Sequence, residues 1–88
     1  MFAYILKAPG TPATEQTDDF FRRFCDTAGL LYAFDLSAEE DPADSLVVAV
    51  WEDRAAAERY LSSAPLRDEV DQALPAITRT MYQVNASK

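Results

Sequence analysis

The stretch LVVAVWEDRAAAERYLSSAPLRDEV, residues Leu46–Val70, decides the fold of this chain. It opens with the continuous apolar run Leu46–Trp51, which is typical of a buried strand. Asp53 follows as a good N-cap, because its carboxylate can accept hydrogen bonds from the free amide groups of a first helical turn. Pro65 suits the first turn of a new helix and would break a continuing one. The stretch therefore predicts a buried strand, a capped helix, a break at 62–65 and a second short helix.

Turn-forming residues divide the rest of the chain into three more strands and one more helix. Pro9, Gly10 and Pro12 end a first strand, since proline and glycine punctuate regular structure. Gly29 is a natural stop for the helix that follows, because glycine takes a left-handed conformation without penalty. The predicted strands are 2–8, 30–37, 45–52 and 76–84, and the predicted helices run from Thr14 or Thr17 to the Gly29 stop, over 53–63 and over 65–74. This β-α-β-β-α-α-β order forms one domain, residues 1–88.

Composition excludes several classes of partner. The 88 residues carry 15 acidic and 8 basic side chains, for a net charge of -7. Such a balance opposes binding to nucleic acid or to an anionic membrane surface. No apolar segment reaches the ~20 residues of a membrane span, and the N-terminus lacks the features of a signal peptide. We therefore expect a cytoplasmic protein, with its single cysteine, Cys25, as a small buried side chain within the first helix.

The predicted strands are apolar on both faces, which bears on assembly. In the second strand, Tyr32 and Phe34 face one side while Leu31 and Ala33 face the other. A sheet with one face in water should instead alternate apolar and polar residues. The helices are too few to cover both faces, and 49% of the residues are hydrophobic, more than so small a core can hide. The sequence therefore predicts an α+β fold, a four-stranded antiparallel sheet with helices on one face and a two-fold homodimer formed through the other.

Three short segments carry a family resemblance. They are Val50–Asp53 leading into a helix, Ser63–Arg67 at the helix break, and Arg79–Tyr82 near the end of the chain. Together they resemble the antibiotic biosynthesis monooxygenase family, of the dimeric α+β barrel (ferredoxin-like) superfamily, and the resemblance covers nearly the whole chain. It implies a face-to-face dimer and a range of activities. Some members are cofactor-independent monooxygenases of phenolic or quinol-like polyketide intermediates, in which a substrate anion gives an electron to dioxygen while the protein positions the reactants and stabilises charge.

The absence of histidine narrows the chemistry. It removes the usual general base and the commonest haem or metal ligand. The haem-degrading branch of the family carries asparagine, tryptophan and a ligand histidine where this chain has approximately Lys7, Tyr60 and Val70, so that activity is not expected. Two glycines cannot form a phosphate-binding loop, and the acidic segment 38–44 is better interpreted as a solvated turn than as a metal site. No cofactor and no metal are therefore expected.

Arg79 is the candidate catalytic residue, because it shares a strand face with Ile77 and Met81 and so stands as a cation among apolar neighbours. It could stabilise a substrate phenolate or a developing oxyanion. An ion pair with an acidic residue of the same or the partner chain is an equally good interpretation. The candidate substrate-binding residues are aromatic side chains that could shape a pocket: Trp51, Tyr60, Tyr32, Tyr82 and Phe34. Each has a structural alternative as a core, interface or rim aromatic.

The sequence thus favours a cofactor-independent monooxygenase that acts on a small aromatic or phenolic substrate with dioxygen. The alternative is a non-catalytic homodimer that binds a small molecule or supports a pathway partner. It fits the missing catalytic bases equally well, because fold-level analogy does not by itself establish chemistry.

Overall fold

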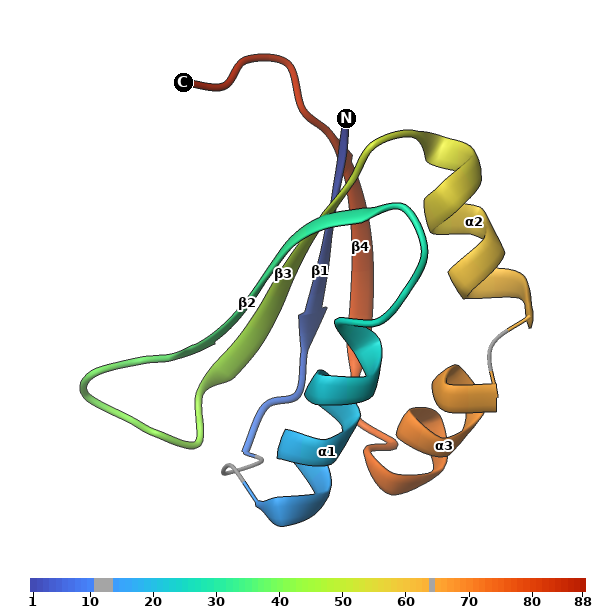
Figure 1. Cartoon of the computed structure of the whole chain (residues 1–88). Coiled ribbons are helices and arrows are strands. Elements are labelled where there is room, and N and C mark those ends of the chain that lie inside the picture. The colour runs from blue at the N-terminus through green and yellow to red at the C-terminus, as the bar shows by residue number, and fades with distance from the viewer. Residues whose placement is uncertain (11–13, 64) are drawn as a thin grey trace.

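The computed structural model describes residues 1–10, 14–63 and 65–88, except for the side chains of 61–63. Pro12 and Ala64, which the sequence assigns to turns, lie outside this part of the chain. The elements in chain order are β1 (Phe2–Lys7), α1 (Glu15–Phe24), β2 (Leu30–Ser37), β3 (Ser45–Trp51), α2 (Arg54–Ser63), α3 (Pro65–Ala73) and β4 (Thr78–Gln83). The sheet has the order β2-β3-β1-β4 with every neighbouring pair antiparallel, and the helices cover one face (Figure 1). The expected ferredoxin-like α+β architecture is confirmed.

Local signals place the starts of the helices as the sequence predicts. Thr14 caps α1, because its hydroxyl accepts from the Thr17 amide at 3.2 Å and the Thr17 hydroxyl accepts from the Thr14 amide at 2.7 Å. Asp53 caps α2 by accepting a 2.8 Å hydrogen bond from the Ala56 amide. Pro65 is the first residue of α3, where its missing amide hydrogen costs nothing.

The end of α1 differs from the prediction. The helix stops at Phe24, and Cys25 is its C-cap with an exposed side chain, so the prediction of a buried cysteine inside the helix is wrong. The reason is a series of tight turns, in which the Thr27 amide donates to the Phe24 carbonyl and the Leu30 amide to the Thr27 carbonyl. Cys25 itself keeps a helical backbone conformation, with its amide donating to the Phe21 carbonyl, so its side chain lies one turn beyond the half-buried Phe21 and outside the buried stripe of Phe20 and Phe24.

Gly29 lies at the end of these turns, and two observations explain why glycine stands there. Its φ of 82° belongs to the left-handed region. A β-carbon at this position would lie 2.6 Å from the Cβ of Ala56, closer than carbon atoms can pack. Gly29 therefore lets the chain between α1 and β2 pass directly over the first turn of α2.

The core lies between the helices and the sheet. Trp51 is fully buried, and its ring packs against those of Tyr4, Phe24 and Tyr60 with centroid separations of 5.6, 5.6 and 5.9 Å. Aromatic pairs in such tilted and edge-to-face arrangements add about 0.5–1.5 kcal/mol each beyond the area they bury. The described helices include none that is long and apolar enough to cross a membrane.

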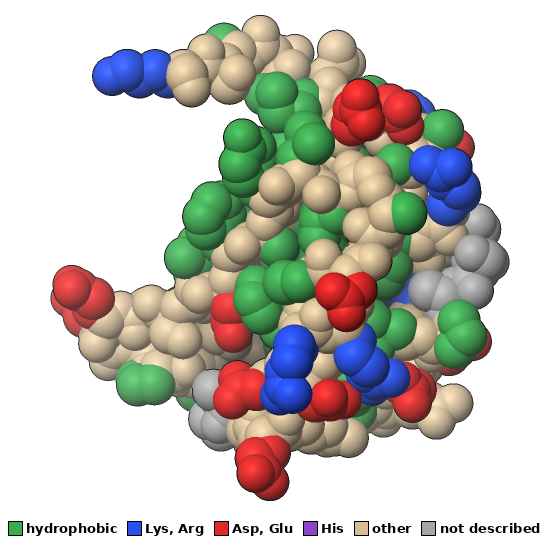
Figure 2. Space-filling view, in the orientation of Figure 1, with side chains coloured by type: hydrophobic (Ala, Val, Ile, Leu, Met, Phe, Trp, Pro, Cys, Tyr) green, Lys and Arg blue, Asp and Glu red, His purple; other side chains and the backbone are tan. Residues whose placement is uncertain are grey.

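The sheet face turned away from the helices is apolar and uncovered, and we call it the open face. Ala3, Ile5, Val48 and Val50 lie at its centre, on the two inner strands. The large apolar side chains around them are exposed to between 46% and 60%: Tyr32, Phe34, Leu36 and Tyr82. Figure 2 shows hydrophobic side chains gathered along this hollowed side of the molecule, between the C-terminal tail and the β2–β3 hairpin.

Candidate ligand pocket

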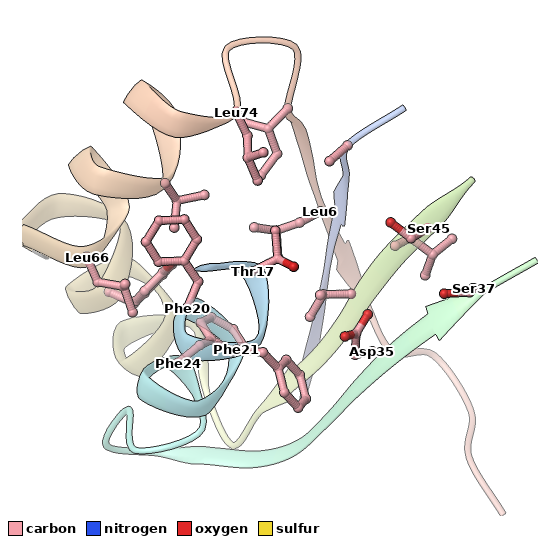
Figure 3. Close-up of a pocket in the computed structure, with 16 residues that line it drawn as sticks. Leu6, Thr17, Phe20, Phe21, Phe24, Asp35, Ser37, Ser45, Leu66 and Leu74 are labelled. Carbon is pink, nitrogen blue, oxygen red and sulfur yellow. The ribbon is translucent and has the colours of Figure 1, made fainter. Parts of the chain in front are cut away.

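An apolar pocket of about 100 Å³ opens between the helix layer and the helix-facing side of the sheet (Figure 3). One wall is aromatic and comes mainly from α1, with Phe20 and Phe24 one helical turn apart. The opposite wall belongs to β1 and to the β2–β3 hairpin. The full set of lining residues is Leu6, Ala8, Thr17, Phe20, Phe21, Phe24, Asp35, Ser37, Ser45, Leu46, Val47, Tyr60, Leu66, Val70, Leu74 and Ile77.

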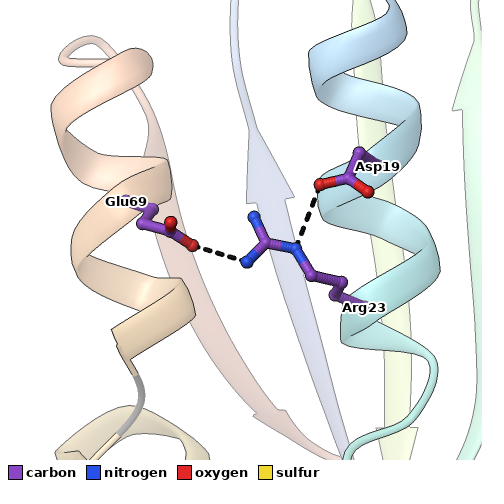
Figure 4. Close-up of polar contacts among 3 residues, drawn as sticks. All are labelled: Asp19, Arg23 and Glu69. Atoms are coloured by element: carbon purple, nitrogen blue, oxygen red, sulfur yellow. Dashed lines mark hydrogen bonds and ion pairs between the residues drawn. The ribbon is translucent and has the colours of Figure 1, made fainter.

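An exposed ion-pair network links α1 and α3. Arg23 on α1 pairs with Asp19 at 3.1 Å and, across the helices, with Glu69 on α3 at 2.7 Å (Figure 4). The hydrogen bond to the Glu69 carboxylate is the main cause that raises the pKa of Arg23. Because these groups are exposed, the network contributes more to the orientation of the helices than to stability.

A second polar cluster is buried beside the aromatic core. Arg79 Nη1 on β4 lies 2.5 Å from Asp71 Oδ1 on α3, and the Arg79 side chain is only 15% exposed. Within the described part of the chain, Arg79 Nε and Nη2 and the Tyr4 hydroxyl are buried without a hydrogen-bond partner. Burial raises the pKa values of Tyr4 and Tyr60, and the charge of Arg79 partly opposes both shifts. The cluster therefore combines a buried cation with two hydroxyl groups held in their neutral form.

The strand register links this cluster to the pocket. Asp35 on β2 lies opposite Val47, Val47 lies opposite Leu6, and Leu6 lies opposite Arg79. These four residues form one row across the helix-facing side of the sheet, with an acid at one end, a base at the other and an apolar floor between. Three strand spacings separate the ends, which corresponds to about 14 Å between Cα atoms.

Comparison with solved structures places this geometry in a known fold. No protein-family model matches the sequence, and no curated protein matches it. SnoaB from Streptomyces nogalater, a cofactor-independent oxygenase, superposes with a TM-score of 0.76 at 17% identity, over 98% of this chain and 94% of that one. An antibiotic biosynthesis monooxygenase matches with a TM-score of 0.70 at 15% identity, over 98% of this chain and 100% of that one. This chain has the antibiotic biosynthesis monooxygenase fold.

A third structure with this fold holds a ligand. It is a monooxygenase from the gene ActVA-Orf6 of Streptomyces coelicolor, in complex with nanaomycin D. It matches with a TM-score of 0.72 at 18% identity, over 99% of this chain and 89% of that one. At sequence identities of 15–18%, the structural likeness establishes the fold alone, and the chemistry of this chain depends on its own residues.

The candidate site residues fall on two faces of this antibiotic biosynthesis monooxygenase fold. Trp51, Tyr60 and Arg79 lie on the helix side, where Tyr60 lines the pocket and Trp51 is a core aromatic. Tyr32, Phe34 and Tyr82 lie on the open face. The structure therefore does not bring these aromatic residues together on one side of the sheet, because alternate residues of a strand point to opposite sides.

Arg79 does not line the pocket, and its ion pair with Asp71 agrees with one of the two interpretations that the sequence left open. The acidic segment before β3 forms a turn, in which Asp41 Oδ1 accepts from the Ala43 amide at 3.1 Å. Across residues 1–10, 14–63 and 65–88, no group of three acidic or cysteine side chains is arranged to hold a metal ion.

Sequence reasoning missed several pocket residues. The spacing of Phe20, Phe21 and Phe24 is typical of a helix face packed in a core, and nothing in it indicates the wall of a cavity. A signal for Asp35 did exist. It follows Ala33 on the helix-facing side of β2, while the alternate positions Tyr32 and Phe34 carry the large apolar side chains. A carboxylate on the helix-facing side of a strand, exposed here near the hairpin, indicates that this part of the sheet is not covered by the core.

Proposed function

We propose that this protein is a cofactor-independent monooxygenase of a small hydroxylated aromatic substrate. The observation that carries the proposal is an aromatic-walled pocket whose floor leads, within one row of the sheet, to the buried guanidinium of Arg79. Its enclosed part is close to the size of one aromatic ring, since a cavity of about 150 Å³ holds benzene, and the second ring of a naphthol would extend through the open side of the pocket. The fold it shares with a cofactor-independent oxygenase supports the same assignment.

The reaction needs no electrons from outside the substrate. A phenol or naphthol loses its hydroxyl proton, and the resulting anion transfers one electron to dioxygen. The substrate radical and superoxide then combine to form a carbon–oxygen bond para to the original hydroxyl, which gives a peroxide anion. This anion takes up one proton, which replaces the proton lost from the hydroxyl, and becomes a hydroperoxide. Loss of the ring proton and of hydroxide, which leave as water, converts the hydroperoxide into a quinone. One oxygen atom of dioxygen enters the product and the other leaves as water.

Arg79 is proposed to stabilise the anions that form in this sequence. Its Nε and Nη2 atoms are buried without a hydrogen-bond partner in the described structure, and Arg79 lies beside Leu6 of the pocket lining, so a substrate oxygen that reaches past Leu6 could accept from them. A cation in a site that excludes water stabilises developing negative charge far more strongly than a solvated one. Asp71 holds the guanidinium in place through its remaining nitrogen, Nη1.

Oxygen uptake by the metal-free protein tests this function, with α-naphthol as substrate and labelled dioxygen to follow the oxygen atoms. We expect one labelled atom in the quinone and a loss of about a hundredfold in kcat for Arg79→Met, since removing one oxyanion donor costs 10²–10³. Asp71→Asn is the matched control, because it breaks the same ion pair but keeps the cation. Equal activity of wild type and Arg79→Met would remove Arg79 from the mechanism, and no uptake with a bound naphthol would exclude the enzyme.

A non-catalytic binding protein is the second candidate. The ion pair of Arg79 with Asp71 favours it, because a paired guanidinium outside the pocket lining can be purely structural. On this reading α-naphthol binds without oxygen consumption. Asp71→Asn would then weaken folding more than Arg79→Met, since it leaves the mostly buried Arg79 without its partner, whereas the part-exposed Asp71 keeps its pair with Arg67 at 3.8 Å.

We further propose that the functional unit is a homodimer formed through the open face. Exposed apolar surface of this kind, continuous over four strands, is rare on monomers and marks an interface. A stable interface buries about 800 Å² on each partner, which is about a seventh of the 5900 Å² that this chain exposes. A two-fold axis packs the open face of one copy against the open face of the other. Each copy would then cover the apolar surface of its partner.

A further inference from the structure

We infer that Asp35 makes the pocket selective for neutral aromatic ligands with a hydroxyl group, by accepting a hydrogen bond from that hydroxyl at the hairpin end of the pocket. The inference rests on the pocket of the proposed function but not on the oxygen chemistry. It assigns a specificity-determining role to a residue on β2, at the opposite end of the row from Arg79.

The position of Asp35 supports this role. Its side chain lies on the helix-facing side of β2, opposite Val47, and lines the pocket with the apolar side chains of α1 across from it (Figure 3). Asp35 and Tyr60 are the two ionisable residues of the pocket lining. Within the described ranges, no hydrogen bond or ion pair engages the carboxylate of Asp35, so its oxygens are available to a ligand.

The other polar side chains of the lining are the neutral hydroxyl groups of Thr17, Ser37, Ser45 and Tyr60, and the one on α1 is already occupied. The Thr17 hydroxyl donates to the Thr14 carbonyl at 3.0 Å and accepts from the Thr14 amide at 2.7 Å. These bonds form the cap of α1, so a ligand could use this hydroxyl only at the expense of the helix start. Asp35 is therefore the strongest available acceptor on the pocket wall, since an ionised acceptor forms a stronger bond than a neutral one.

The charge of the pocket decides which ligands fit. The lining contains no lysine or arginine, so a ligand carboxylate placed beside Asp35 would meet a like charge without a compensating cation. A phenolic hydroxyl instead donates a hydrogen bond to it. The row across the sheet also orients the ligand, because a hydroxyl donor belongs at the Asp35 end and an anionic oxygen at the Arg79 end.

Three probes of nearly equal shape test the inference: para-cresol, toluene and para-toluate. We expect wild-type protein to bind para-cresol about tenfold more tightly than toluene, as a hydrogen bond to a charged acceptor gives, and para-toluate most weakly. Titrations followed by protein NMR measure all three affinities and report on folding in the same spectra. In Asp35→Ala, the advantage of para-cresol over toluene should disappear while toluene binding is kept. Glu40→Ala, which removes an exposed acidic side chain from the loop after β2, is the matched control and should change nothing.

Two results would overturn the inference. One is that wild-type protein binds para-cresol and toluene equally, and the other is that Asp35→Ala weakens both to the same degree, which would mean a general effect on the pocket. Failure of the proposed function looks different. In that case the binding preferences and their loss in Asp35→Ala persist, but α-naphthol causes no oxygen uptake.

Discussion

At the scale of single residues, the buried tyrosines make stability depend on pH. Burial raises the pKa values of Tyr4 and Tyr60 in the folded state above the ordinary value of about 10. The folded protein therefore retains two protons that the unfolded chain loses, so their contribution is complete below pH ~10 and is lost as the pH rises beyond it.

We accordingly expect the free energy of unfolding to fall above pH ~10 by up to about 1.4 kcal/mol per pH unit for each of these tyrosines. Urea unfolding at a series of pH values measures the slope. Tyr60→Phe should make it shallower, whereas Tyr82→Phe on the open face serves as the exposed control. An identical slope in wild type and Tyr60→Phe would show that Tyr60 does not contribute to the pH dependence of stability.

The two glycines provide a second prediction at this scale. Both have positive φ, but a β-carbon at Gly29 would collide with Ala56 while one at Gly10 would meet nothing within 4 Å. Gly29→Ala should therefore destabilise the protein by about 2–4 kcal/mol, from backbone strain plus overpacking, and Gly10→Ala by about 1 kcal/mol from strain alone. Thermal or chemical denaturation of the two variants measures their free energies of unfolding. Equal losses of stability in Gly29→Ala and Gly10→Ala would show that the contact with Ala56 relaxes freely.

At the scale of elements, the Asp53 cap fixes the start of α2 and contributes to the stability of the fold. Asp53→Ala removes the acceptor for the Ala56 amide and should cost about 1 kcal/mol of stability. Glu52→Ala, at the neighbouring exposed position, is the control and should cost little. If both substitutions had the same effect, the loss would reflect charge near the helix start and not the cap.

Much of the fold was predictable from such local signals, because capping residues and prolines act within a few positions of themselves. Asp53 and Pro65 placed two helix starts correctly, and for α1 the structure selects Thr14 from the two candidate caps, Thr14 and Thr17, that the sequence left open. The end of α1 was not predictable from Gly29, because the turns before it depend on the close passage over Ala56, a contact between distant parts of the chain.

The candidate site was harder to predict than the fold. Alternation along a strand separates the two faces of the sheet, but it does not show which face carries the cavity. Arg79 stood out as a cation among apolar residues, yet its partner Asp71 belongs to a different element. The pocket itself depends on how far α1 and α3 stand from the sheet, which is a property of tertiary packing.

At the scale of the whole molecule, the open face predicts the oligomeric state. Sedimentation velocity should show a dimer for wild type and a monomer for Phe34→Glu, because a charge within the proposed interface would be buried without a partner. Ala55→Glu, which adds the same charge to an exposed position on α2, should remain a dimer. A monomeric wild type, or a dimeric Phe34→Glu, would refute the proposed interface.

The central claim is that the two apolar faces have separate roles, with ligands bound on the helix side and the second copy on the open face. Intermolecular NOEs from para-cresol to the methyl groups of the protein test it most directly. We predict contacts to Leu6, Val47 and Val70, which line the pocket. Contacts instead to Ile5, Val48 and Val50 would place the ligand on the open face and contradict the account.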